Sequence, residues 1–435
     1  MTPAELTYTR AIQELEGALR FGINPSLDGI RTLTARLAEP QDAYRCVQVT
    51  GTNGKTSVTR LLSAILHAHG LRVGTYTSPH LVSYTERVEI DGVPITEECF
   101  ARSVSAALEA SGDMRDSAVT EFELLTAAAL DAFRHHQVTW ACLEVGMGGR
   151  WDATSVVVPR VSVVTGVALD HTDRLGMTRE EIAGDKAYII KPGAVAVIGP
   201  GCTGVESILR DRARAVGAPM VRVGPINGDV TWRVLSVPCA PGGMTHLVVD
   251  GAFTVYDDLE VRAPSYQAPN VAVAIAAAEA ALGQPLDSDA LRETLATMVF
   301  PGRFELLGEA PSLLIDGAHN PEAATVLAGA VREAFGGKKP IIVLGVMADK
   351  DAEGIVRALA PVAGGFVCTQ SHSPRALDAE ALADIVRSCG AVVLGTERSV
   401  ESAVAHARLM LAPGVVCAGS IYVAGEVRAL FNPVP

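Results

Sequence analysis

The sequence contains little that is typical of a secreted or membrane-bound chain. Its 435 residues hold no run of about 18 or more apolar residues, the length needed to cross a bilayer. The first residues, MTPAELTYTRAIQELEGAL, include acids and lack the apolar centre of a signal peptide. The eight cysteines are scattered and form no CxxC pair, as is typical of reduced thiols. We therefore expect a cytoplasmic protein that binds no membrane.

Basic residues are also in short supply. The chain has 36 Lys and Arg against 49 Asp and Glu, which gives a formal net charge of −13 at pH 7. A sequence-independent nucleic-acid surface needs clustered positive charge, so we expect no nucleic-acid partner. A small anionic ligand remains compatible with this composition, because a few local basic residues can override the net sign. The length itself suggests two or three domains.

One stretch has a clear chemical signature. Residues 46–69 read as a short strand, a loop of sequence GTNGKTS and an amphipathic helix. Glycines at a helix N-terminus expose backbone N–H groups to an anion, Lys55 adds a charge for the β- and γ-phosphates, and Thr56 or Ser57 offers a hydroxyl to Mg²⁺. The general P-loop pattern is not met, because Val49 stands where its first glycine would be.

The rest of the chain alternates strands and helices. Alternation up to residue 198 predicts a mostly parallel sheet covered on both faces, and residues 224–261 read as small antiparallel strands. A second alternation begins near residue 312, after the break FPGRFE. We therefore predict an α/β protein whose N-terminal domain carries a phosphate loop, a parallel sheet and a small antiparallel subdomain. The predicted division is 1–297, a linker at 298–303, and 304–435.

Four candidate residues stand at or just beyond the ends of predicted strands: Lys55, Ser78, Glu144 and His171. Ligands of parallel sheets bind at the carboxyl ends of the strands, so one site can draw on all four segments. Glu144 ends an apolar strand, and a carboxylate facing a phosphate-loop hydroxyl suits Mg²⁺. His171 alone reads as a hydrogen-bonding residue, and Lys186 alone as a solvated lysine.

Nine short motifs occur in a fixed order and cover nearly the whole chain: GTNGKTS, TSPHL, ERVEIDG, EVGMGGRWDAT, LDHTDRLG, IAGDKA, FPGRFE, DGAHNP and SPRAL. Together they resemble the folylpolyglutamate synthase/dihydrofolate synthase family of Mur-type ligases. The resemblance implies a P-loop domain, a linker and a Rossmann-like C-terminal domain. It also implies an ATP-dependent amide ligase that adds L-glutamate to a folate-type carboxylate, dihydropteroate or tetrahydrofolate or both, through an acyl phosphate.

The resemblance also implies roles for individual residues. Catalytic roles fall to Lys55, His171 and Lys186, with Lys186 carbamylated by CO₂. ATP would be bound by Gly51, Thr52, Asn53, Gly54, Lys55, Thr56, Ser57, Asn270, Arg303, Asp316 and His319. Two Mg²⁺ sites would use Thr56, Ser57, Ser78, Glu144, His171 and Lys186, and a monovalent cation is compatible with the family. Substrate would be bound by Arg87, Thr120, Phe122, Asp152, Ser373 and Ser420.

Three residues depart from the family pattern, the segment at 21–24 is shorter than the family pattern expects, and these departures leave the acceptor open. Ser155 replaces an asparagine, Tyr188 a glycine, and Tyr266 a histidine. The segment TEFE at 120–123 resembles bifunctional bacterial members, which favours both folate activities. One alternative is a Mur-type ligase that acts on a non-folate carboxylate, and another is a nucleotide-binding module without catalysis. We expect a monomer.

Overall fold

The computed structural model describes residues 6–18, 25–114 and 119–431. Within them, an eight-stranded sheet has the order β4-β3-β2-β5-β1-β6-β7-β8. The strands β2-β5-β1-β6-β7-β8 run parallel to one another, and β3 and β4 add antiparallel pairs at one edge. The central strands are buried along almost their whole length, as expected for parallel strands covered on both faces. The strands are β1 (Arg45–Thr50), β2 (Val73–Tyr76), β3 (Val88–Ile90), β4 (Val93–Pro94), β5 (Trp140–Glu144), β6 (Val161–Gly166), β7 (Val195–Gly201) and β8 (Met220–Arg222).

Helices cover both faces of this sheet. On one face pack α3 (Lys55–Ala68), α9 (Ala268–Leu282) and α10 (Ser288–Thr297), together with a small antiparallel sheet. That sheet consists of β9 (Thr231–Ser236), β10 (Thr245–Asp250) and β11 (Val255–Val261). The other face carries α1 (Tyr8–Gly17), α2 (Asp28–Arg36), α4 (Glu97–Ser111), α5 (Glu121–His135), α7 (Arg179–Lys186) and α8 (Glu206–Val216).

The remaining elements form a second, six-stranded sheet of order β12-β13-β17-β14-β15-β16, parallel except for β12. Its strands are β12 (Glu305–Glu309), β13 (Ser312–Ile315), β14 (Ile341–Leu344), β15 (Gly365–Cys368), β16 (Val393–Thr396) and β17 (Gly414–Ala418). Its faces are covered by α11 (Pro321–Phe335), α12 (Ala352–Leu359), α13 (Ala379–Ser388), α14 (Val400–Arg408) and α15 (Ile421–Phe431). We call these elements the C-terminal body and all preceding elements the N-terminal body.

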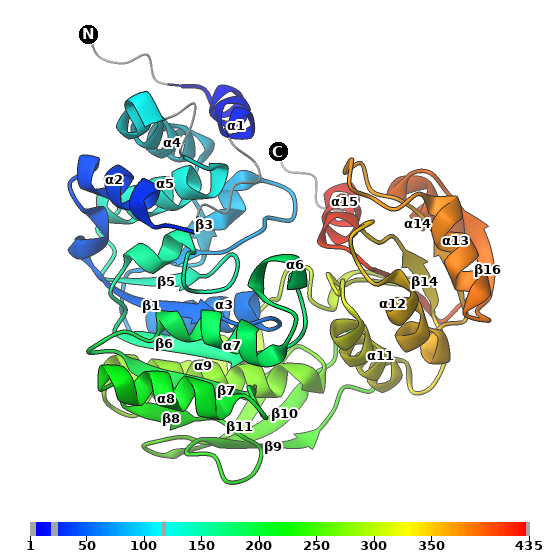
Figure 1. The fold of residues 1–435 in the computed structure, drawn as a ribbon. Helices are drawn as coiled ribbons and strands as arrows, with labels where there is room; N and C mark the ends of the chain where they lie inside the picture. The colour runs from blue at the N-terminus through cyan, green and yellow to red at the C-terminus, as the bar shows by residue number, and fades with distance from the viewer. Residues whose placement is uncertain (1–5, 19–24, 115–118, 432–435) are drawn as a thin grey trace.

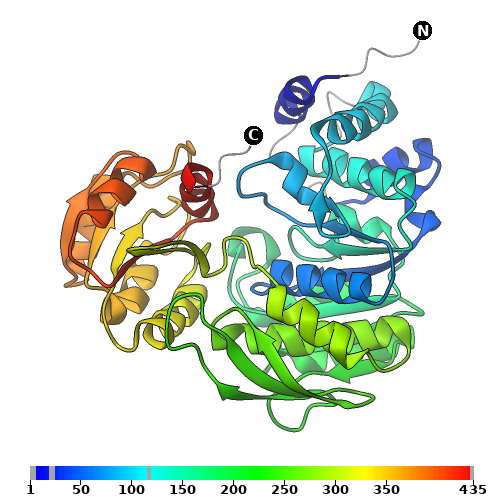
Figure 2. The ribbon, with the colours of Figure 1, turned by 180° about the vertical axis from the view of Figure 1, so that it is seen from behind.

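The two bodies stand beside each other, and the loops that follow the parallel strands of the larger sheet face the space between them (Figure 1). The view from behind shows the same separation, with α15 turned toward the N-terminal body (Figure 2). The predicted α/β fold class is confirmed, including the small antiparallel sheet and the parallel C-terminal sheet. Among the described residues, no helix is long and apolar enough to cross a membrane.

Candidate active site between the two bodies

The loop between β1 and α3 has the shape of a phosphate cradle. Gly54 has φ of 84°, a left-handed conformation that favours glycine, and it turns the chain directly into the N-terminus of α3. The loop is held from outside: Thr165 Oγ1 donates to the Asn53 carbonyl (2.7 Å), and the Thr52 N–H donates to the Gly166 carbonyl (2.9 Å). The first amides of α3 therefore remain directed at the cavity, where an anion is favoured.

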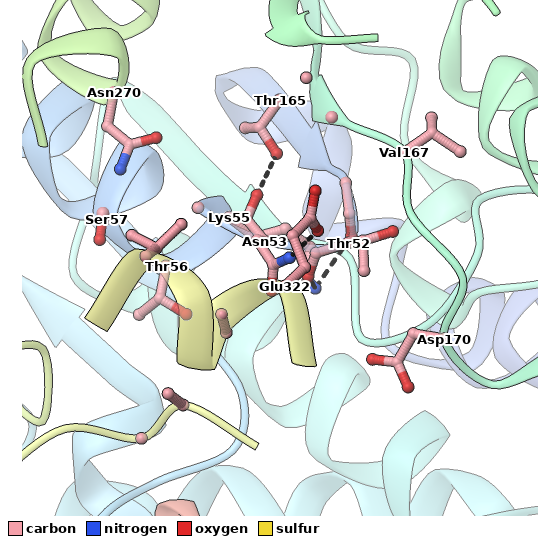
Figure 3. A pocket seen from close by; sticks show the side chains of 18 of the residues that line it. Thr52, Asn53, Lys55, Thr56, Ser57, Thr165, Val167, Asp170, Asn270 and Glu322 are labelled. Carbon is pink, nitrogen blue, oxygen red and sulfur yellow. Dashed lines mark hydrogen bonds between the residues drawn. The ribbon is translucent and has the colours of Figure 1, made fainter. Parts of the chain in front are cut away.

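Two lysines converge on the same loop carbonyl. Lys55 Nζ donates to the carbonyls of Gly51 (3.0 Å) and Thr52 (3.1 Å), and Lys186 Nζ donates to that of Gly51 (3.2 Å). The contact of Lys55 with Thr52 is visible in Figure 3. Burial lowers the pKa of Lys55, and burial together with repulsion from Lys55 lowers the pKa of Lys186 to about 7. Bringing an anion here would relieve the repulsion between the two ammonium groups.

Glu144 occupies the centre of this site. It is only 1% exposed, and its two carboxylate oxygens accept hydrogen bonds from Thr56 Oγ1 (2.9 Å) and from the Ser78 N–H (3.3 Å). Burial raises the pKa of Glu144. From the sequence, either Thr56 or Ser57 could offer a hydroxyl to Mg²⁺. In the structure the Thr56 hydroxyl meets Glu144, whereas Ser57 Oγ accepts from Gln267 Nε2 (3.2 Å) on another side of the helix.

The donors around Glu144 fit a hard divalent cation. Among the described residues, no group of three or more His, Cys, Asp and Glu side chains gathers as a preformed metal cage. Mg²⁺ rarely uses such cages: it takes one or two carboxylates, hydroxyls, waters and substrate phosphates. A buried carboxylate paired with the Thr56 hydroxyl at the phosphate loop is a donor set of that kind. His171 lines the same cavity with a side chain that is 39% exposed.

The C-terminal body supplies the opposite wall of a cavity of about 400 Å³. Asp316 follows β13, and its carboxylate accepts from the backbone N–H groups of Phe304 (2.9 Å) and Ala318 (2.8 Å). His319 binds the Gly317 carbonyl through Nδ1 (2.8 Å), and burial lowers its pKa to about 4. The histidine is therefore neutral at pH 7.

A direct ion pair bridges the bodies beside this cavity. Lys350 Nζ lies 2.9 Å from Asp170 Oδ1, and both side chains are about one-seventh exposed. The other carboxylate oxygen lies 3.8 Å from His171 Nε2 and 3.9 Å from His319 Nε2. Neither Asp170 nor Lys350 was a candidate from the sequence. Lys350 follows β14 at the carboxyl edge of its sheet, and this position was the available signal.

Polar contacts and apolar side chains together make up the rest of the cavity lining. Asn270 Nδ2 donates to Gln267 Oε1 (2.7 Å), and Asn53 Nδ2 donates to Glu322 Oε2 (2.5 Å) across the two bodies (Figure 3). Tyr266 donates a long hydrogen bond to Asp316 Oδ2 (3.4 Å). Apolar lining comes from Pro269, Val273, Ala323, Val326 and Leu327.

A second cavity, of about 380 Å³, adjoins the first. The two share five lining residues: Ser78, Pro79, Gly146, Met147 and Leu175. All four N-terminal residues predicted to bind substrate line the second cavity: Arg87, Thr120, Phe122 and Asp152. A ligand in the second cavity can therefore reach the phosphate end of the first through the shared wall.

Each of these four side chains is held by its neighbours. Arg87 Nε donates to His80 Nδ1 (2.9 Å), which leaves the rest of its guanidinium to the cavity. Thr120 caps α5. Phe122 packs so closely on Gly146 that a Cβ there would lie 2.6 Å from its ring.

Asp152 is an organiser of the loop after β5. It accepts hydrogen bonds from the N–H groups of Met147 (3.0 Å) and Thr154 (3.0 Å). Its carboxylate is thereby occupied by the protein, and burial raises its pKa.

Comparison with known proteins decides the family. The Mur ligase middle domain matches residues 49–278, and the Mur ligase glutamate ligase domain matches residues 302–421. The chain is 38% identical over 451 residues to the dihydrofolate synthase/folylpolyglutamate synthase of Mycobacterium tuberculosis, covering 95% of this chain and 91% of that protein. The chain belongs to the folylpolyglutamate synthase/dihydrofolate synthase family of Mur ligases.

Solved structures of this ligase family share the whole fold. Mycobacterium tuberculosis folylpolyglutamate synthase complexed with ADP has a TM-score of 0.91 and 36% identity, covering 98% of this chain and 99% of that one. Escherichia coli FolC in complex with DHPP and ADP has a TM-score of 0.87 and 32% identity, covering 99% of each chain. The resemblance drawn from the nine motifs is thus confirmed.

Two residues of this chain that were predicted to bind substrate, Ser373 and Ser420, lie outside both cavities. Ser373 Oγ accepts from the N–H of Arg375 (3.3 Å), and Ser420 Oγ accepts from the N–H of Tyr422 (3.1 Å) at the start of α15. Neither residue lines either cavity. In this arrangement both hydroxyls serve local turns, because each is nearest to a backbone donor two residues ahead.

The departures from the family pattern have separate consequences. Ser155 is buried, donates to the Gly149 carbonyl (2.6 Å) and accepts from Gln48 Nε2 (2.9 Å), so it ties the loop after β5 to the sheet. Tyr266 lines the nucleotide-sized cavity. Tyr188 touches neither cavity and stands half in solvent.

Proposed function

We propose that this chain is an ATP-dependent ligase that joins L-glutamate to a folate-type carboxylate, dihydropteroate or tetrahydrofolate or both. The observation that carries the proposal is the shared wall at Ser78, Pro79, Gly146 and Met147, where a phosphate-binding cavity meets an acceptor-sized cavity. The related Escherichia coli protein is in complex with DHPP and ADP, and another relative is an FPGS-AMPPCP-folate complex. A nucleotide together with a pterin or folate in these relatives supports the proposal that each cavity takes one of the two substrates.

The first cavity would hold ATP. Gly51, Thr52, Asn53, Gly54, Lys55, Thr56 and Ser57 would surround its phosphates, and Asn270, Arg303, Asp316 and His319 would reach it from the far wall. Mg²⁺ would be held by Glu144, the Thr56 hydroxyl, Ser78 and, at a second position, His171 and Lys186. When bound, Mg²⁺ supplies positive charge against the phosphate oxygens. A monovalent cation remains part of the proposal on family resemblance alone.

The reaction follows from where the charges lie. The acceptor carboxylate reaches the γ-phosphorus through the shared wall and attacks it, releasing ADP and forming an acyl phosphate. Lys55 stabilises the negative charge that develops on the phosphate oxygens. The amine of L-glutamate then attacks the acyl carbon, and phosphate leaves as the amide forms. The C-terminal body covers the cavity and keeps water from the acyl phosphate.

Lys186 is proposed to carry a CO₂-derived carbamate. Lys186 is 3% exposed, and burial lowers the pKa of its amine to about 7, so a substantial share of the amine is uncharged at neutral pH and able to attack CO₂. A carbamate would exchange a repelling ammonium beside Lys55 for an anion that suits a metal. The Gly51 carbonyl, which Lys186 now contacts, faces the same space.

The chain organisation belongs to the proposal as well. We assign residues 1–297 to the ATP-binding domain, 298–303 to the linker and 304–435 to the ligase domain. We further propose that the enzyme acts as a monomer, without a nucleic-acid or membrane partner. We assign it to the cytoplasm.

The test is ADP release from purified protein with ATP, Mg²⁺ and L-glutamate, in parallel with dihydropteroate, with tetrahydrofolate and with no acceptor. We expect acceptor-dependent ADP release and a product heavier by one glutamyl residue in mass spectrometry. The Lys55→Met variant serves as the inactive control. Absence of turnover with both pterins, while ATP still binds, would overturn the folate assignment and favour a non-folate acceptor.

A further inference from the structure

An arginine stands between two aromatic rings on the surface beside the second cavity. We call that cavity the acceptor cavity, because the proposed function places the acceptor there. The Cζ atom of Arg150 lies 4.7 Å from the ring centre of Trp151 and 4.4 Å from that of Tyr188. Arg212 brings a second guanidinium, with Cζ 5.0 Å from the Tyr188 ring. We call these four residues the arginine–aromatic stack. Such distances are typical of cation–π contacts.

Three separate segments build the stack. Arg150 and Trp151 lie in the loop after β5, Tyr188 in the 3-10 turn (Ala187–Ile189) after α7, and Arg212 in α8. In Figure 1 the helices α7 and α8 lie side by side below α6 (Thr172–Leu175). Trp151 and Tyr188 are each 38% exposed, although burial of an aromatic side chain is favourable in free energy. Tyr188 is also where this chain departs from the family glycine.

The guanidinium groups keep hydrogen-bonding capacity. Among the described residues, Arg150 has no ion-pair partner, and Asp185 accepts from its backbone N–H (3.4 Å), not from its side chain. Arg212 uses Nε on the Ile190 carbonyl (3.1 Å), which leaves its two terminal nitrogens. Stacking on a ring engages the face of a guanidinium and leaves its N–H edge for a carboxylate. Because the whole chain has a net charge of −13, these two guanidinium groups form a local site of positive charge that can attract an anion.

Trp151 connects the stack to the second cavity, which is proposed to hold the acceptor. It lines the acceptor cavity, so the stack begins at that cavity's wall and continues outward over Tyr188 to Arg212. On the proposed function, every turnover adds one carboxylate to the acceptor, and the product is itself a candidate acceptor. An acceptor with several γ-linked glutamates is therefore too long for a cavity of about 380 Å³ to enclose. It also carries several carboxylates outside that cavity.

We propose that the arginine–aromatic stack binds the carboxylates of acceptors that already carry several glutamates, and so sets how well long acceptors are extended. This inference rests on the proposed ligase function. The stack takes no part in the reaction with short acceptors, which lie within the cavity.

The experiment compares kcat and KM for tetrahydrofolate acceptors with one, three and five glutamates in wild type, Arg150→Gln and Arg212→Gln. We expect KM for the two longer acceptors to rise about fivefold in each variant, the scale of an exposed charge-assisted contact, with values for the monoglutamate unchanged. Arg150→Lys keeps the charge but loses the planar stack, and we expect it to behave like Arg150→Gln.

Arg214→Gln is the matched control. Arg214 is exposed on the same helix as Arg212 and belongs to no stack, so its loss should leave all three acceptors unaffected. A free γ-linked pentaglutamate should inhibit wild type more strongly than Arg150→Gln. Equal effects on all acceptor lengths, or none on any, would overturn the stack proposal while the ligase function stands. Inactivity of wild type with every acceptor would overturn both.

Discussion

The Lys350 ammonium donates a hydrogen bond of 2.9 Å to the Asp170 carboxylate and so joins the C-terminal body to the loop after β6. Burial would raise the pKa of Asp170, but His171 and Lys350 hold it to about 2. The carboxylate is therefore ionised at any working pH of the enzyme. This pair ties the two walls of the nucleotide cavity together.

Replacing Lys350 should weaken that closure. In Lys350→Met the ionised Asp170 loses its partner while still largely buried, which costs roughly 3 kcal/mol in the closed arrangement. We expect kcat to fall at least about tenfold, with the thermal unfolding of the N-terminal body little changed. Asp170→Asn combined with Lys350→Met should lose less than the sum of the two single variants.

Lys339→Met is the control for the Lys350 prediction, because Lys339 is an exposed lysine of the same body. It should keep wild-type kcat. Wild-type kcat in Lys350→Met as well would show that the ion pair does not matter for closure.

Lys186 should make activity depend on CO₂. We expect wild type to lose activity when CO₂ and bicarbonate are removed and to regain it when bicarbonate returns. Because the amine pKa is about 7, the reactive neutral form dominates above pH 7 and declines below it, so recovery should be faster at pH 8 than at pH 6. Lys186→Ala should stay at low activity with or without bicarbonate. Wild-type rates in that variant would exclude a role for the carbamate.

Much of the site could be predicted because its residues lie next to strand ends. Glu144 ends a recognisable strand, the phosphate loop and His171 each follow one, and parallel strands bring their carboxyl ends to one edge. The turn at Asp91 and Gly92, which have φ of 53° and 81°, also follows a local signal, because an Asp-Gly pair favours a hairpin turn.

What could not be predicted depends on contacts between distant segments. The Asp170–Lys350 pair joins residues 180 positions apart, and no local pattern records which loop of the second body will face the first. Thr56 and Ser57 have different partners, Glu144 and Gln267, and both partners lie far along the chain. Helix α7 ends at Lys186 and continues as a 3-10 turn at Ala187–Ile189, and a helix boundary of this kind is hard to place from sequence alone.

Phe122 should control acceptor binding without touching ATP. Its ring lines the acceptor cavity, packs on Gly146 and lies 6.1 Å from the ring of Tyr76. We expect Phe122→Ala to raise KM for the pterin acceptor at least about tenfold, since truncating this partly buried aromatic side chain removes roughly 2 kcal/mol of contact, and to leave KM for ATP unchanged. Phe122→Leu should fall between the two. A parallel rise in KM for ATP would contradict the separation of the cavities.

The contact between Gly425 and Leu81 provides the sharpest test of how closely the two bodies must approach. Gly425 lies in α15, and a Cβ there would stand 2.1 Å from the Leu81 carbonyl oxygen, in the loop that supplies Ser78 and Pro79 to both cavities. Gly425→Ala should therefore hold the bodies apart, lowering kcat at least about tenfold while the N-terminal body still binds ATP.

Gly329→Ala is the matched control for Gly425→Ala, because Gly329 lies in α11 and a Cβ there would meet nothing within 4 Å. In both helices alanine favours the helical backbone by about 0.5–1 kcal/mol, so helix propensity cannot explain a loss at Gly425. We expect Gly329→Ala to keep full activity and to raise the unfolding temperature slightly. If both variants kept wild-type kcat, with ATP affinity measured in the same samples, close approach of α15 to the Leu81 loop would not be required for ligation.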